Sequence, residues 1–282
     1  MAGTLFVVAT PIGNLEDITV RALRILREAS IIAAEDTRRT AHLLARHAIA
    51  TPTTSLHEHN EATKAASLIA RLQRGDSVAL VSDAGTPTVS DPGAGLIRQA
   101  IDAGIRVEPI PGPSAVLTIL AASGLPTESF TFLGFPPTRA NDRAEWFGSL
   151  RAAPGTVVFF EAPHRITGTL DELCRTIGDC EIVVGRELTK VHEELVRGHI
   201  SEVVSQLSGT KGELTVALFI GQKTDIGASR VPTAPELAAE VGDMTAKPGM
   251  TRRRAVNVVA RKHGLAPNRV YEMVEAAKKS GV

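Results

Sequence analysis

Four loops near the start of the sequence carry Gly, Pro, Ser and charged residues that suit contact with a polar ligand. Each follows a short apolar run and precedes a helical pattern, which is where α/β proteins bind ligands. The loops are Ala9-Thr-Pro-Ile-Gly-Asn, Ala34-Glu-Asp-Thr-Arg-Arg, Ser82-Asp-Ala-Gly-Thr-Pro with Ser90-Asp-Pro-Gly, and Pro111-Gly-Pro-Ser-Ala. The first loop has neither the glycine spacing of a dinucleotide fingerprint nor a Walker A sequence, so an NAD-dependent oxidoreductase is disfavoured.

Three residues define what these loops can do. Gly85 lets the backbone approach a ligand closely. Asp83 can pair with a cationic or hydroxyl-bearing group, and backbone N–H groups near Ser114 can receive an anion. A tight turn, or a turn capped by Ser114, would explain each loop taken alone. Two Asp/Gly/Pro clusters after one strand favour a ligand loop, with Asp91 interpreted as the entry to the next helix.

Charged and His residues gather at two strand-to-helix junctions. Glu35 and Asp36 come directly after an apolar strand, where a core position would not suit them. His57 and His59 form an HxH pair that resembles a metal site, but no third and fourth ligand has suitable spacing, so we expect no metal. The two His alternate along an expected extended segment, so they are predicted to face opposite ways.

Similar charged groups follow strands in the middle of the chain, in Phe160-Glu-Ala-Pro-His-Arg and Gly185-Arg-Glu-Leu-Thr-Lys. Arg165, Arg186 and Lys190 could hold phosphates. Ion pairing within the domain, among Arg186, Glu187, Lys190 and Glu193, is the alternative.

The elements that must position these loops are short strands alternating with amphipathic helices. Strands are expected over residues 4–10, 31–34, 77–81, 105–109, 131–133, 156–160, 182–184 and 214–220. Helices are expected over residues 18–28, 38–47, 60–74, 93–103, 114–122, 139–150, 164–177, 234–241, 251–263 and 267–279. Strands separated by helices imply parallel pairing and an α/β fold.

We expect two α/β domains, over residues 1–122 and 123–221, with a small helical C-terminal module. A polar linker over residues 222–232 leads to that module, residues 233–282, whose three-helix pattern resembles a helix-turn-helix. Its small core is expected to contain Ala255, Val258, Val259, Leu265, Val270 and Met273.

Composition excludes several classes of protein. Hydrophobic residues make up 43% and charged residues 22%, which excludes a disordered or fibrous chain. The formal net charge is zero, yet residues 246–282 hold nine Lys or Arg against two Asp or Glu, a net of +7, and the rest has a net of −7. Cys174 and Cys180 cannot build a disulfide framework. Without a basic leader or a long apolar run, the chain is expected to be cytoplasmic.

Together the motifs resemble the tetrapyrrole methylase superfamily, and within it a bacterial branch that methylates small-subunit ribosomal RNA. The four loops carry the resemblance with His57-Glu-His-Asn-Glu, Glu161-Ala-Pro-His-Arg and Arg186-Glu-Leu-Thr-Lys, in unbroken order from about Leu5 to Ile220. It is looser in the C-terminal module. Members that act on tetrapyrroles often have a glycine-rich first loop, and the departure here favours RNA over a porphyrin.

The resemblance implies S-adenosylmethionine (SAM) in a cleft between two α/β domains, usually in a homodimer. It also implies methyl transfer to the ribose 2′-oxygen of a cytidine in the decoding centre of 16S ribosomal RNA, in the small ribosomal subunit. The cofactor loops of the superfamily correspond here to Pro11, Ile12, Gly13, Ser82, Asp83, Ala84, Gly85, Thr86, Pro113, Ser114 and Ala115. Phe160 and Leu214 are expected to close the adenine pocket.

A ribose hydroxyl is a poor nucleophile, so a general base would help its reaction. The candidates are Asp36, Glu35, His59 and Glu161. Asp36 is favoured because it follows a strand and is expected to face the cleft. RNA phosphates are expected to contact Arg38, Arg39, Arg165, Arg186, Lys190, Arg252, Arg253 and Arg254.

Two other functions stay open at this point. A small-molecule methylase acting on a tetrapyrrole would have an open apolar trough and no need of a basic tail. A ribosome assembly factor that holds SAM without turnover would have damaged cofactor loops.

Overall fold

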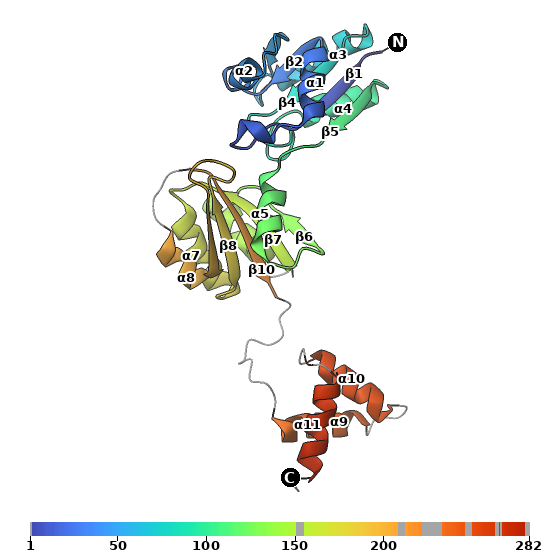
Figure 1. The fold of residues 1–282 in the computed structure, drawn as a ribbon, viewed down its shortest axis with the longest axis vertical. Helices are drawn as coiled ribbons and strands as arrows, with labels where there is room; N and C mark the ends of the chain where they lie inside the picture. Colours follow the sequence, from blue (N-terminus) through green and yellow to red (C-terminus); the bar gives the residue numbers. More distant parts are fainter. Residues whose placement is uncertain are drawn as a thin grey trace. The chain divides into compact units, whose positions relative to one another are not determined.

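The computed structural model describes residues 2–150, 155–207, 212–221, 233–245, 250–262, 265 and 267–279. The chain divides into two compact units, Met1–Gln222 and Lys223–Val282. Among the described residues, the first unit contains two five-stranded sheets with their helices, and the second contains three helices (Figure 1). The linker expected over residues 222–232 lies outside the described residues.

The first sheet consists of parallel strands in the order β3-β2-β4-β1-β5. They are β1 (Thr4–Val8), β2 (Ile31–Ala34), β3 (Thr53–Ser55), β4 (Val78–Val81) and β5 (Arg106–Ile110). β1 and β4 are neighbours, but the chain continues from β1 to β2 and from β4 to β5, on opposite sides of this pair. Open α/β sheets bind ligands at such a switch point, beyond the carboxyl ends of the strands. The polar β3 was not predicted.

Helices cover both faces of this sheet. α1 (Val20–Glu28) and α2 (Thr37–Arg46) share one core, and α3 (Glu61–Gln73) and α4 (Ala94–Asp102) share the other. Strand β4 shows why: its alternate residues Ala79 and Val81 face α1 and α2, while Leu80 faces the other pair. A short 3-10 turn, η1 (Leu15–Asp17), precedes α1.

The second sheet has the order β6-β7-β10-β8-β9. Its strands are β6 (Phe130–Phe132), β7 (Gly155–Glu161), β8 (Glu181–Arg186), β9 (Glu194–His199) and β10 (Leu214–Ile220). β6 and β7 are parallel, but the other three pairs are antiparallel, so the prediction of parallel pairing is wrong for this half. β8 and β9 are joined by residues 187–193, too few for the crossover that parallel strands need. β9 was not predicted.

Four helices pack on the second sheet. α6 (Ala140–Leu150), α7 (Ile166–Ile177) and α8 (Ile200–Gln206), the last not predicted, share a core on one face. α5 (Ala115–Ser123) packs on the other face, with Ile119 and Leu120 against Val158 and Val183. α5 was expected to end the first domain at residue 122. Because α5 packs on the second sheet, the boundary between the two halves lies before this helix, in the loop over residues 111–114.

The C-terminal unit consists of α9 (Ala234–Thr245), α10 (Arg252–Lys262) and α11 (Pro267–Lys279). Its core contains Leu237, Val241, Ala255, Val256, Val259, Ala260, Val270 and Val274. Val258, which was expected in this core, is 39% exposed, so that prediction is wrong. In the described part of the chain, no helix has the length and apolar character that crossing a membrane requires.

Candidate cofactor cleft

A cavity of about 430 Å³ lies where the loops of the first sheet meet the second half of the unit. This volume is within the range of about 300–1,000 Å³ that small-molecule sites usually have. The loops after β1, β2, β4 and β5 and the first turn of α2 contribute Ile12, Glu35, Arg39, Asp83, Ala84, Gly85, Thr86, Val89, Ser90, Asp91 and Ser114. The second half and α5 contribute Ala115, Val116, Phe135, Phe160, Glu161, Ala162, Pro163, Leu188, Gly212, Glu213, Leu214 and Thr215.

Most of the expected cofactor residues belong to this wall. Those that line the cavity are Ile12, Asp83, Ala84, Gly85, Thr86, Ser114, Ala115, Phe160 and Leu214. Pro11, Gly13, Ser82 and Pro113 belong to the same loops but do not line it. The loops therefore reach the site as expected, but these four residues are not part of its lining.

The loops after β1 and β4 are fastened to each other. Thr10 and Gly85 exchange backbone hydrogen bonds of 2.8 and 3.0 Å, and the buried Thr10 hydroxyl donates to the Ser82 carbonyl at 3.2 Å. Gly85 has a φ of +83°, a left-handed conformation that glycine adopts without steric cost. Gly85 therefore holds two loops of the cavity wall together. The sequence predicted instead that Gly85 lets the backbone approach a ligand closely.

Asp83 joins the loop after β4 to the loop after β2. Its Oδ1 accepts a hydrogen bond from the Asp36 backbone N–H at 2.9 Å, and its own N–H donates to Glu35 Oε2 at 3.4 Å. Arg39 Nε lies 3.5 Å from Asp83 Oδ2. The loop after β4 thus holds the charged residues that follow β2 against the cavity.

Five residues that line the cavity carry carboxyl groups: Glu161 and Glu213 come from the second half, and three, Glu35, Asp83 and Asp91, come from the loops of the first sheet. Burial, and then the charges of Glu35 and Asp83, raise the pKa of Asp91 to about 6, while a hydrogen bond with Ser82 opposes the shift. Burial and the charge of Asp83 also raise the pKa of Glu35. Because the three negative charges disfavour one another, the site favours a ligand with positive charge or several hydrogen-bond donors.

Asp91 is the main polar residue of the site that sequence reasoning missed. The Asp91-Pro-Gly segment was interpreted as the entry to a helix, and α4 does begin directly after it, at Ala94 with Gly93 at its N-cap. The side chain of Asp91 itself was not expected in the site. The repeated Ser-Asp pair, Ser82–Asp83 and Ser90–Asp91, was the signal that could have identified it. Val89, Phe135 and Leu188 carried no comparable signal in the sequence.

Asp36, the favoured general base, has its carboxylate occupied within the chain. It caps α2 by accepting from the Arg38 N–H at 2.8 Å, and it also accepts from Arg38 Nε and Nη2 at 3.1 and 2.9 Å. These hydrogen bonds lower the pKa of Asp36 to about 2. Asp36 does not line the cavity, whereas the candidates Glu35 and Glu161 do.

His59, another candidate base, also lies outside the lining of the cavity. Residues 58–60 form a turn, and the rings of His57 and His59 meet edge to face with centroids 6.1 Å apart. The prediction that they face opposite ways is therefore wrong, because the segment is not extended. The described residues include no group of three His, Cys, Asp or Glu placed to hold a metal.

Aromatic side chains form the second half's part of the wall. Phe160 contacts Phe132 and Phe135, with ring centroids 4.9 and 5.3 Å apart. Phe135 is 54% exposed and is followed by Pro136 and Pro137. The position of this loop therefore decides the shape of the aromatic side of the cavity.

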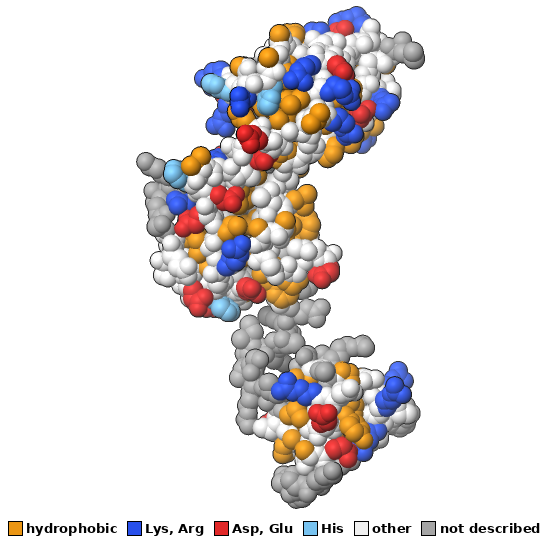
Figure 2. Space-filling view, viewed as in Figure 1, with side chains coloured by type: hydrophobic (Ala, Val, Ile, Leu, Met, Phe, Trp, Pro, Cys, Tyr) orange, Lys and Arg blue, Asp and Glu red, His pale blue; other side chains and the backbone are white. Residues whose placement is uncertain are grey.

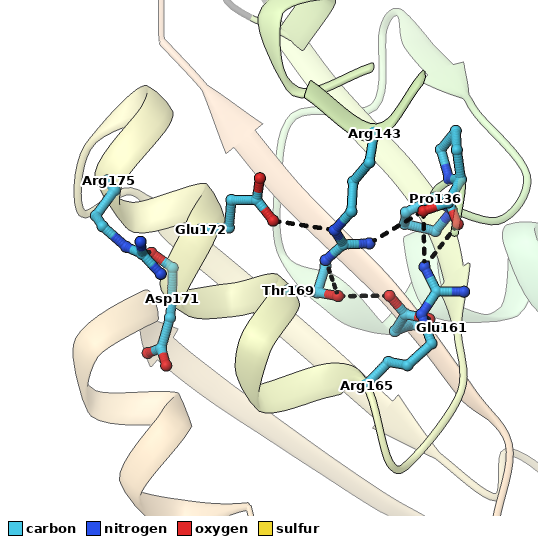
Figure 3. Close-up of polar contacts among 9 residues, drawn as sticks. Pro136, Arg143, Glu161, Arg165, Thr169, Asp171, Glu172 and Arg175 are labelled. Carbon is cyan, nitrogen blue, oxygen red and sulfur yellow. Dashed lines mark hydrogen bonds and ion pairs between the residues drawn. The ribbon is translucent and has the colours of Figure 1, made fainter. Parts of the chain in front are cut away.

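Arg165 holds that loop in place (Figure 3). Its Nη2 donates to the carbonyls of Pro136 and Pro137 at 2.7 and 3.1 Å, and its Nε lies 3.3 Å from Glu161 Oε1. The buried Glu161 also accepts from Ala162 N at 2.8 Å and from Thr169 Oγ1 at 2.5 Å. Arg165 was expected to contact RNA, but these partners commit its guanidinium to the fold.

Arg143 extends the same network toward α6 and α7. It donates to Glu172 at 3.0 Å, to Thr169 Oγ1 at 2.8 Å and to the Pro137 carbonyl at 3.4 Å (Figure 3). Arg143 and Arg165 therefore both hold the Pro136–Pro137 segment. The buried Glu161 carboxylate contacts Arg165 directly and reaches Arg143 through Thr169.

Arg186 and Lys190 pair with carboxylates inside the second half, as the ion-pair alternative predicted. Arg186 Nε donates to Glu194 at 2.9 Å, and Lys190 Nζ contacts Glu187 at 2.9 Å and Glu213 at 3.1 Å. The partner of Arg186 is Glu194, whereas the alternative named Glu193. A Cβ at Gly13 would come within 2.5 Å of Lys190 Cγ, so this segment packs directly on the first loop.

The basic residues of the C-terminal unit are exposed at the start of α10. Arg252 pairs with Glu275 and lies over the Tyr271 ring, 5.7 Å from its centroid. Arg253 and Arg254 are also exposed. They remain available for the RNA contact that the sequence predicted.

The fold and the cavity define an α/β protein of two sheets with a cavity of small-molecule size between its halves. The family described as tetrapyrrole (corrin/porphyrin) methylases matches residues 4–204. The chain belongs to this family, which confirms the fold class expected from the motifs.

Curated relatives narrow the similarity to one group. A protein of Halalkalibacterium halodurans is 51% identical over 202 residues, covering 72% of this chain and 70% of its own. One of Escherichia coli O157:H7 is 39% identical over 277 residues, covering 96% and 94%, and one of Pseudomonas aeruginosa is 40% identical over 289 residues, covering 99% of both. All three are named ribosomal RNA small subunit methyltransferase I.

Solved structures share the fold at low identity. A diphthine synthase has a TM-score of 0.62 at 17% identity and covers 77% of this chain and 90% of its own. A uroporphyrin-III C-methyltransferase from Thermus thermophilus, complexed with S-adenyl homocysteine, has a TM-score of 0.55 at 20% identity and covers 76% and 97%. Both match about three quarters of the chain.

Proposed function

We propose that this chain transfers a methyl group from SAM to the ribose 2′-oxygen of a cytidine in the decoding centre of 16S ribosomal RNA. The relatives' shared name supports an RNA of the small ribosomal subunit as the substrate. A structural neighbour with bound S-adenyl homocysteine supports SAM as the cofactor. The observation that carries the proposal is the cavity, since the expected cofactor loops converge on it from both halves.

The residues of the cavity fit SAM. Phe135, Phe160 and Leu214 offer apolar surface for an adenine ring. Asp83 can accept hydrogen bonds from the ribose hydroxyls or the ammonium group of SAM, and Glu35, Asp83 and Asp91 together provide the negative charge that a cationic sulfonium ligand needs. The Ser114 side chain caps α5 by accepting a hydrogen bond from the Leu117 backbone N–H, and the N-terminus of this helix suits the ligand's carboxylate. When bound, SAM supplies a methyl group already activated by its positive sulfur.

The protein's contribution is to orient the ribose hydroxyl and to take its proton. Orientation of two reactants is worth about 7–11 kcal/mol of the barrier in favourable cases. Glu35 is the base that the geometry supports best, because it lines the cavity and burial raises its pKa toward the working range. Asp36 has its lone pairs occupied by Arg38 and a pKa of about 2, which makes it a weak proton acceptor.

Matched amide variants separate these two bases. Glu35→Gln should lower methyl transfer about 10²–10⁴-fold, the usual effect of losing a general base. Asp36→Asn should keep most of the turnover, because Asn caps a helix as well as Asp does. SAM binding is measured for both variants by calorimetry. Loss of turnover in Asp36→Asn alone, with SAM affinity unchanged, would restore Asp36 as the base.

The substrate is tested by transfer of labelled methyl from SAM to small ribosomal subunits from cells that lack this protein. The RNA is digested and the modified nucleoside is identified. A 2′-O-methylcytidine product supports the proposal. Label on a tetrapyrrole instead, or SAM binding without label on any acceptor, would replace it with a small-molecule methylase or an assembly factor.

The proposal extends to the C-terminal unit and to assembly. The exposed Arg253 and Arg254 support RNA docking by this unit, so deletion of residues 233–282 should weaken binding to small subunits. A homodimer stays a prediction from the resemblance and is checked by light scattering. A cytoplasmic location follows from the proposed substrate.

A further inference from the structure

Two neighbouring helices present a row of arginines on the outside of the first sheet. α1 carries Arg21, Arg24 and Arg27, and α2 carries Arg38, Arg39 and Arg46, all exposed; we call these six residues the arginine face. The opposite sides of both helices pack in one core. Arg27 Nη2 donates to the His47 carbonyl at the end of α2, so the two helices are in direct contact.

Positive charge gathers here against the prevailing charge of the chain. α1 and α2 together hold six arginines and one acidic residue, Glu28, and two of the six, Arg38 and Arg39, pair with carboxylates outside these helices, Asp36 and Asp83. α3 and α4, on the other side of the same sheet, hold three basic and two acidic residues. Residues 1–245 as a whole have a net charge of −7. Figure 2 shows Lys and Arg side chains gathered over this half of the unit. Such a local excess indicates a polyanionic partner.

Two of these arginines are held by neutral groups. Arg21 Nη2 donates to the Pro109 carbonyl at 3.1 Å, and Arg27 Nη2 donates to the His47 carbonyl at 3.2 Å. A carbonyl orients the guanidinium without cancelling its charge, so its remaining donors stay available. Arg24 pairs with Glu28, but both side chains are more than half exposed, and such pairs contribute little.

The arginine face reaches the cavity through Arg39. Arg39 lines the cavity, yet its side chain is 65% exposed. It belongs to the same helix as Arg46, which is at the far end of α2. A strand bound along α2 would therefore lead from the outer surface to the rim of the candidate active site.

We propose that the arginine face binds the phosphate backbone of the RNA substrate and guides the target nucleotide to the cavity. This inference rests on the proposed function and extends the RNA contact beyond Arg38 and Arg39 to Arg21, Arg24, Arg27 and Arg46. Planar guanidinium groups suit phosphate oxygens, which they bind through two parallel hydrogen bonds. Contacts of this kind fix the position of the RNA without reading its sequence.

The test compares two double variants of the full chain. Arg24→Gln with Arg46→Gln removes two charges from the arginine face and leaves the carbonyl-bound arginines in place. Arg98→Gln with Arg106→Gln is the matched control: Arg98 pairs with Asp102 four residues later, as Arg24 does with Glu28, and both control residues lie outside α1 and α2. Thermal unfolding establishes that all proteins are folded.

Binding of small ribosomal subunits is measured at 50 and 200 mM salt. Losing two phosphate contacts lowers the slope of log affinity against log salt by about 1.4–1.8. The added salt should therefore weaken wild-type binding about 7–12-fold more than it weakens the variant. The control should follow the wild type.

Two results would overturn the inference: equal salt slopes for wild type and variant, or an equal change in the control. A variant that loses affinity without a change of slope would also overturn it, because the two arginines would then act through contacts that neutralise no phosphate. Methyl transfer by the wild-type protein is measured in parallel. If transfer occurs but the slopes are equal, the arginine face fails while the proposed function stands. If no RNA is methylated, the proposed function fails, whatever the slopes.

Discussion

The two halves of the first unit contribute different chemistry to one cavity. The first half supplies polar loops and three carboxyl groups from the ends of parallel strands. The second supplies aromatic and apolar side chains, and its two carboxylates, Glu161 and Glu213, pair with Arg165 and Lys190. In the second sheet, the end of β7 and the start of β10 meet because these strands are antiparallel, with Glu161 opposite Leu214 and Phe160 opposite Thr215. The two sheets thus form one site in different ways. In the first, loops converge at the ends of parallel strands, and in the second, antiparallel pairing brings two strand ends together.

The halves are also held together differently. In the first half, backbone hydrogen bonds and a glycine with positive φ fix the wall. In the second, a buried carboxylate and two arginines hold the Pro136–Pro137 segment (Figure 3). The second arrangement depends on a buried charge, so we expect it to be the more sensitive to single substitutions.

Glu161→Ala should have the largest effect on stability. It removes the partner of Arg165, Thr169 and Ala162 N from a buried site, and breaking a buried ion pair usually costs about 3–5 kcal/mol. The free energy of unfolding is measured by urea titration. Glu28→Ala, which breaks the exposed pair with Arg24, is the control and should cost less than about 1 kcal/mol. Similar costs for the two variants would contradict the difference between the halves.

Gly85→Ala should have a smaller effect on stability and a specific effect on cofactor binding. Its φ of +83° makes alanine unfavourable by about 1–2 kcal/mol. Gly104→Ala is a matched control, because Gly104 has a φ of +69° and a Cβ there would meet open space away from the cavity. Both variants should lose similar stability, but Gly85→Ala alone should weaken SAM binding, measured by calorimetry. Equal SAM affinity in the two variants would show that Gly85 does not shape the site.

The same difference explains what the sequence could predict. In the first half, buried β-branched strands and capped helices follow one another regularly, so every element except β3 and η1 was predicted, and the loops after β1, β4 and β5 reach the cavity as expected. In the fourth ligand loop, which follows β2, Glu35 and Arg39 reach the cavity, but Asp36 does not. Asp36 is turned away from the cavity because it caps α2 and pairs with Arg38, and Glu35 faces the cavity instead. The order of the residues alone does not determine these contacts.

Prediction was weaker in the second half because its contacts are less local. β9 has charged residues and lies at a sheet edge, so it lacked an apolar alternation. Phe135 reaches the cavity through carbonyl contacts with Arg165, thirty residues later in the chain. The assignment of Arg165 to RNA used its charge alone, and the structure shows that its hydrogen-bond donors are engaged by Pro136 and Pro137.

The smallest predicted effect tests the carboxylates that distinguish the first half. Asp91 has a pKa of about 6, above its ordinary value of 3.8, so it gains a proton as the pH falls through 6. The ionised form attracts a cationic ligand, so SAM should bind more weakly at pH 5 than at pH 7. If bound SAM lowers the pKa of Asp91 by about one unit, the affinity should fall about fivefold over this range.

S-adenosylhomocysteine separates charge from shape in this experiment, because it lacks the positive sulfur. Its affinity should change less with pH than that of SAM, and Asp91→Asn should flatten the SAM profile. Burial favours the protonated form of Asp91, so its contribution to stability is complete below the ordinary pKa of 3.8 and is lost as the pH rises from there through about 6, which opposes the trend in SAM binding. The two trends can therefore be measured on the same protein, one by unfolding and one by calorimetry. Parallel pH profiles for both ligands would mean that the carboxylates hold hydroxyl and ammonium groups common to both, with no preference for the sulfonium charge.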